Sequence, residues 1–65
     1  MNAVHILENK ISSVQGYLDG LKNYDKYTEK EIEEVKRIRR ALERDLYLLT
    51  QSTIDLAEAV VSYKK

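Results

Sequence analysis

The chain has 65 residues, and its eleven basic and eleven acidic side chains cancel to a net charge of zero at pH 7. A general nucleic-acid or membrane-surface binder is normally basic, so this balance argues against both classes. The absence of Cys excludes disulfides and thiolate metal sites, and a single His excludes a multi-His metal cage within one chain. We therefore expect no metal site and no cofactor. So short a chain usually needs a further source of stability, and oligomerisation is the one left.

The first predicted helix covers about residues 2–23. Six apolar side chains follow one another at alternating spacings of three and four residues, which is typical of one helix face: Val4, Leu7, Ile11, Val14, Leu18 and Leu21. We interpret this stripe as core. Asn2 is placed to cap the helix. Gly16 and Gly20 either allow a neighbouring helix to approach closely or only weaken this one.

The second predicted helix covers about residues 29–63. The periodicity lapses over residues 23–28, where we expect a turn, and Thr28 followed by Glu31 is typical of a capping box at a helix start. No Gly or Pro interrupts the chain after Gly20. The fold prediction is therefore all-α, with residues 1–65 forming a single domain, an antiparallel hairpin of two helices.

Residues 42–61 of the second helix are apolar on nearly every face, and such a helix is normally buried. The first helix, about 32 Å long, would reach only to about Leu49 of a second helix about 52 Å long. The rest would project uncovered, so we predict a homo-oligomer, either a four-helix bundle or a larger helical assembly. The predicted interface residues are Leu46, Leu49, Ile54, Leu56, Val60, Val61 and Tyr63.

The same segment is long enough to span a bilayer, but it contains five charged side chains. Each charge would cost roughly 2.5–3.5 kcal/mol in a membrane. The N-terminal residues lack the basic and apolar regions of a signal peptide. We expect a cytoplasmic protein with no membrane partner.

The sequence contains no recognisable catalytic constellation. His5 is the only base available to the serines, and in the predicted hairpin it would lie level with Leu46–Leu49. Six polar side chains interrupt the apolar helix and need partners, either across helices or as remnants of a polar site: Asp45, Thr50, Gln51, Ser52, Thr53 and Asp55.

One basic cluster consists of Lys36, Arg37, Arg39, Arg40 and Arg44. Lys36, Arg40 and Arg44 are four residues apart on one helix face, a spacing that suits contacts to successive phosphates. The alternative is a solvated face on which Glu33 pairs with Arg37. The five tyrosines could likewise stack on bases, although packing explains most of them.

The segments KISSVQGYLDGL (Lys10–Leu21) and ALERDLYLLTQSTIDLAEAVVSYKK (Ala41–Lys65) resemble the N-terminal half of HepT-like proteins, in the HEPN superfamily of ribonuclease toxins. Residues 43–46 match the family pattern Glu-Arg-x-Leu, and residues 54–57 match Ile-Asp-Leu/Ile-Ala. The resemblance implies a dimerising helical bundle and an antitoxin partner of nucleotidyltransferase type. The family cleaves RNA with an Arg followed by a His on a later helix. Here His5 precedes every Arg, so no catalytic residue carries over.

Three functions follow as alternatives. The first is a non-catalytic module, a truncated HepT-like hairpin that associates with itself. The second is a fragment or partner-completed half of a HEPN ribonuclease toxin from a toxin–antitoxin system. The third is a small RNA-binding hairpin that uses the basic cluster around Lys36, Arg40 and Arg44.

Overall fold

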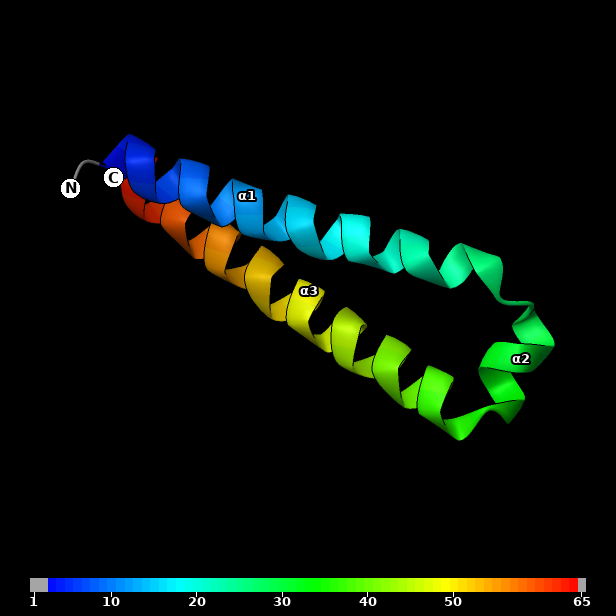
Figure 1. Ribbon diagram of the computed structural model, residues 1–65. Coiled ribbons are helices and arrows are strands. Elements are labelled where there is room, and N and C mark those ends of the chain that lie inside the picture. The colour runs from blue at the N-terminus through cyan, green and yellow to red at the C-terminus, as the bar shows by residue number, and fades with distance from the viewer. Residues whose placement is uncertain (1–2, 65) are drawn as a thin grey trace.

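The computed structural model describes residues 3–64, so the predicted cap at Asn2 lies outside the described residues. The described chain forms helix α1 (Ala3–Leu21), a 3-10 helix η1 (Lys22–Lys26), helix α2 (Glu29–Glu34) and helix α3 (Lys36–Lys64). Helices α1 and α3 run antiparallel, and α2 closes one end of the hairpin (Figure 1). The molecule is a rod of 46 × 15 × 15 Å. The all-α class and the helical hairpin are confirmed.

The capping box predicted at Thr28 is confirmed. The Glu31 backbone N–H donates to Thr28 Oγ1 at 3.1 Å, and the Thr28 backbone N–H donates to Glu31 Oε1 at 3.0 Å. These two bonds satisfy donors that the start of a helix leaves free. Helix α2 accordingly begins at Glu29, as predicted.

The prediction of one continuous helix over residues 29–63 is wrong at Val35. Its backbone is extended, with φ −87° and ψ 100°, and this residue separates α2 from α3. The break turns α2 across the end of the hairpin (Figure 1). Because Glu33 and Arg37 no longer share a helix, their predicted ion pair does not form. Arg39 instead donates to the Glu33 carbonyl at 3.3 Å, one of the acceptors that the end of α2 leaves free.

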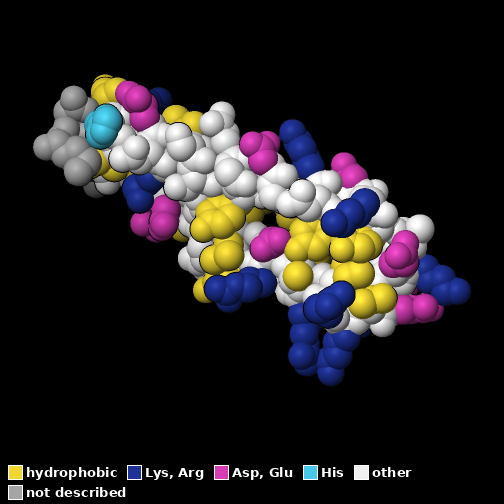
Figure 2. Space-filling model, viewed as in Figure 1, with side chains coloured by type: hydrophobic (Ala, Val, Ile, Leu, Met, Phe, Trp, Pro, Cys, Tyr) yellow, Lys and Arg dark blue, Asp and Glu magenta, His cyan; other side chains and the backbone are white. Residues whose placement is uncertain are grey.

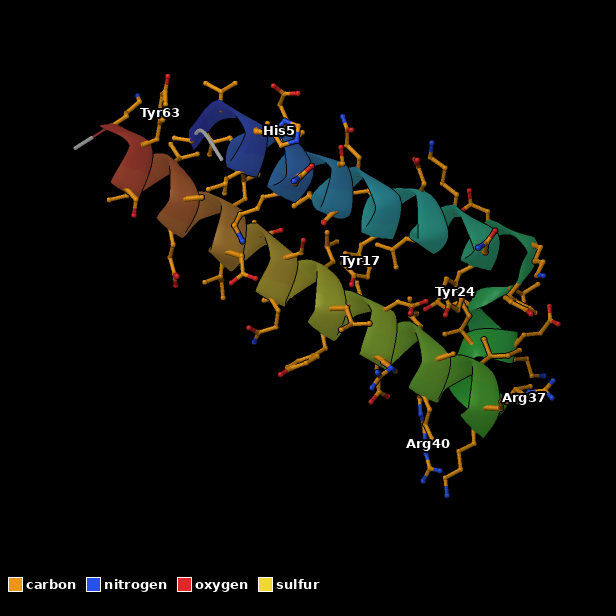
Figure 3. All side chains as sticks on the ribbon, turned by 60° about the vertical axis from the view of Figure 1, so that its left-hand side comes forward. His5, Tyr17, Tyr24, Arg37, Arg40 and Tyr63 are labelled. Carbon is orange, nitrogen blue, oxygen red and sulfur yellow. The ribbon has the colours of Figure 1, made fainter. Side chains whose placement is uncertain are left out.

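The predicted projection beyond Leu49 is also wrong. Because α2 is a separate helix, α3 is only about 43 Å long, while α1 extended by η1 reaches about 38 Å. The start of α1 therefore lies beside the end of α3 (Figure 1). His5 lies at the Tyr63 end of the hairpin and not level with Leu46–Leu49 (Figure 3).

No side chain between residues 3 and 64 is fully buried. The seam between α1 and α3 is formed by half-buried side chains: Leu7, Val14 and Leu21 of α1, and Ile38, Leu42, Asp45, Leu49, Ser52, Leu56 and Ala59 of α3. The helices diverge toward α2 (Figure 1). Small residues, Ser52 and Ala59, lie in the narrow part of the seam, and the rings of Tyr24 and Tyr27 lie near its wide end.

Candidate interaction surface

The two sides of the hairpin differ in character. On one side Ser13 and Tyr17 of α1 line a shallow hollow together with four residues of α3, among them Ser52 and Asp55. The residues that line this hollow show which flank of α1 and which flank of α3 face this side of the hairpin. From the helical repeat of 3.6 residues per turn, the residues on the opposite flank of each helix can then be identified. We call the opposite side the broad face.

The broad face is apolar. Val4, Ile11 and Leu18 repeat every seven residues along α1 and are 47%, 43% and 47% exposed, respectively. Leu46 and Val60 lie on the matching flank of α3 and are 44% and 37% exposed. Together these five side chains form an apolar strip along the rod, a feature that usually marks an interaction site.

A second apolar row, which we call the outer stripe, consists of Tyr47, Ile54 and Val61. It repeats every seven residues on the side of α3 that faces away from α1. Tyr47 and Val61 are each 59% exposed and Ile54 is 46% exposed. The two-helix hairpin has no element on that side, so α1 cannot cover this stripe.

The predicted interface residues are thus divided among different surfaces. Leu49 and Leu56 lie half-buried in the seam of the hairpin itself. Leu46 and Val60 lie on the broad face, Ile54 and Val61 lie on the outer stripe, and Tyr63 is exposed near the end of α3.

Sequence reasoning missed the α1 half of the broad face. The sequence predicts Val4, Ile11 and Leu18 to lie in the core with Leu7 and Val14, because both rows fit one amphipathic face. A single partner helix half-buries only the row of Leu7 and Val14. The signal was the width of the apolar face, which exceeds what one neighbouring helix can cover.

Three of the polar side chains of α3, those of Asp45, Thr50 and Thr53, form hydrogen bonds within the hairpin. The Tyr24 hydroxyl donates to Asp45 Oδ2 at 2.7 Å, which ties η1 to α3. This hydrogen bond, with partial burial and the negative charge of Asp45, raises the pKa of the Tyr24 phenol to about 12. Thr50 and Thr53 donate to carbonyls one turn earlier in α3, at 2.9 and 2.8 Å. Three of the six polar side chains that interrupt the apolar helix therefore have hydrogen-bond partners within the hairpin.

The basic cluster lies at the turn end of the hairpin. Arg39 contacts Glu43 at 3.7 Å. Lys36, Arg40 and Arg44 are exposed, and within residues 3–64 they form no hydrogen bond or ion pair. Lys and Arg side chains extend from this edge of the molecule (Figure 2), and Arg40 points away from α1 (Figure 3).

The structure holds His5 far from Arg37 and Arg40. His5 lies at the opposite end of the hairpin from Arg37 and Arg40 (Figure 3). Over residues 3–64 no group of three or more His, Cys, Asp or Glu side chains is arranged to hold a metal ion. None of the helices in this part of the chain combines the length and the apolar character needed to cross a membrane.

Neither glycine of α1 provides a close approach within the chain. A Cβ atom built on Gly16 or Gly20 would meet no atom within 4 Å.

Comparisons with protein-family models, with curated proteins and with solved structures gave no match to this chain.

Proposed function

We propose that this protein is a non-catalytic self-association module, in which a second copy of the hairpin covers the broad face. The observation that carries the proposal is the apolar strip formed by Val4, Ile11 and Leu18 of α1 with Leu46 and Val60 of α3. Packing between α1 and α3 leaves these five side chains exposed to solvent. A second hairpin packed against them would cover them and form a four-helix bundle.

The areas support a second copy as the occupant. The chain exposes 5292 Å², whereas a compact monomer of 7.6 kDa would expose about 4300 Å². Each long side of the rod has a projected area of about 700 Å², so a second copy lying along the broad face has room to bury an area near the roughly 800 Å² that each partner buries in a standard interface. A net charge of zero also means that two copies carry no net repulsion.

The resemblance to HepT-like proteins belongs to the same proposal. In such a protein the hairpin would supply an association surface, and it carries no match to the family's catalytic Arg and His. The proposal places the assembly in the cytoplasm, and any nucleotidyltransferase-type antitoxin partner rests on the resemblance alone.

The enzymatic alternative, a fragment or partner-completed half of a HEPN ribonuclease toxin, requires that the family's Arg-and-His motif come from outside these 65 residues. General acid–base cleavage of RNA needs a group that moves protons near neutral pH, usually His. The separation of His5 from Arg37 and Arg40 supports a chain that is inactive alone (Figure 3). Purified protein should leave labelled RNA whole, and cleavage that is lost in His5→Ala would favour an enzyme.

The test of self-association is the dependence of stability on concentration. Association stabilises the folded state by mass action, so an associating protein melts at a higher temperature when it is more concentrated. We expect such a shift over a hundredfold range of concentration, together with a dimer or larger mass by light scattering. A cooperatively melting monomer whose Tm is independent of concentration would refute the proposal.

A further inference from the structure

A hollow of about 350 Å³ lies at the turn end of the hairpin, between η1 and the first turns of α3. Seven described residues line it, and none of them is acidic: Asn23, Tyr24, Lys26, Tyr27, Arg37, Ile38 and Ala41. Its volume is at the lower end of the range for small-molecule sites, which is about 300–1,000 Å³.

The aromatic part of this turn hollow is held in place. The hydroxyl of Tyr24 is bonded to Asp45 at 2.7 Å. The Tyr24 and Tyr27 rings lie with centroids 6.3 Å apart and planes tilted by 47°. A planar ligand could stack on such a preorganised ring, since base–aromatic stacking does not require a particular base.

The cationic part consists of Lys26 and Arg37. Lys26 Nζ lies 5.2 Å from the centre of the Tyr27 ring. The Arg37 side chain forms no hydrogen bond or ion pair within residues 3–64, so its guanidinium is available for an anion. Arg37 also belongs to the first turn of α3, a helix of 29 residues whose dipole favours negative charge at that end.

We propose that the turn hollow binds a small phosphorylated aromatic compound of the nucleoside monophosphate class, with the base against Tyr24 or Tyr27 and the phosphate between Lys26 and Arg37. This goes beyond self-association. Arg37 and Ala41 lie on the flank of α3 that also carries Leu48 and Asp55, so the turn hollow lies on the side opposite the broad face. A second copy on the broad face leaves it open.

The probes are AMP, UMP, adenosine and inorganic phosphate, titrated into the full chain by calorimetry and by amide chemical shifts. We expect both monophosphates to bind, and adenosine and phosphate each to bind at least about tenfold more weakly. Arg37→Gln should weaken AMP binding at least about tenfold, the scale of one lost charge-assisted hydrogen bond. At least one of the variants Tyr24→Leu and Tyr27→Leu should weaken AMP binding, and both should leave phosphate binding unchanged.

Arg40→Gln is the matched control, because Arg40 points away from the hairpin and does not line the turn hollow (Figure 3). It should bind AMP like the parent chain, and helical circular dichroism should be equal in all variants. Equal losses in Arg37→Gln and Arg40→Gln would mean non-specific charge attraction and overturn the proposal. So would equal affinity for AMP and phosphate, or no saturable binding at millimolar AMP. Binding that persists in Ile11→Asp would separate this site from the association surface.

Discussion

A single charge on the broad face should separate the copies without unfolding the hairpin. Ile11 is 43% exposed in the isolated hairpin, so Asp at this position can remain largely hydrated there. Complete burial of an Ile side chain contributes about 1.5–3 kcal/mol, so covering the exposed part contributes about 1 kcal/mol. Two copies in a dimer lose about 2 kcal/mol, which is roughly a 30-fold rise in Kd. Burial of the unpaired carboxylate adds to this loss.

The assay is sedimentation equilibrium of Ile11→Asp at several protein concentrations. The matched control is Asn9→Asp, which adds the same charge to α1 but two residues earlier, on the other side of the helix. We expect Kd to rise at least about 30-fold for Ile11→Asp, and to change little for Asn9→Asp. If the two variants have the same Kd, the broad face is not the surface that a second copy covers.

Three further predictions concern the hairpin itself. The tyrosinate absorbance should contain a component that titrates near pH 12 and disappears in Tyr24→Phe. Folding raises the pKa of Tyr24 above its ordinary value near 10, so the protonated phenol stabilises the folded state. This stabilisation is complete below pH 10 and is lost as the pH rises toward 12, which melting experiments at several pH values can test. Thr28→Ala should lower the unfolding free energy by about 0.5–2 kcal/mol in denaturant titrations and Thr28→Ser by far less, because Ser keeps the cap; equal losses would mean that the cap is unimportant. Gly16→Ala should raise helix stability by about 0.8–1 kcal/mol, since the added methyl group has open space; a loss would indicate that another copy approaches this glycine closely.

The regular helices and the cap were predictable from local patterns. The repeat from Val4 to Leu21 predicted α1, and Thr28 with Glu31 predicted the start of α2. These signals depend on residues within one or two turns of each other, so they need no knowledge of the tertiary structure.

The break at Val35 was not predictable in the same way. Val35 continues the apolar spacing and no Gly or Pro lies between Gly20 and Val35, so the local sequence favours a helix through it. At this residue the chain turns so that α2 crosses the end of the hairpin, an arrangement that local sequence signals do not specify. The break also brings Lys26 and Arg37 to the same hollow and sets the register in which Tyr24 meets Asp45. The tyrosines and basic residues of this site could be identified in the sequence, but the sequence did not predict that they lie together in space.

The antiparallel arrangement also has a consequence for the order of folding. The contact between Tyr24 and Asp45 closes a loop of only 21 residues, whereas the start of α1 meets the end of α3 across nearly the whole chain. Loop-closure entropy grows with the length of the loop, so contacts near the turn cost the least to form. The hairpin should therefore close from the turn toward its ends. In a stopped-flow experiment, a probe at Tyr24 should report contact no later than a fluorophore pair attached near Val4 and Val61.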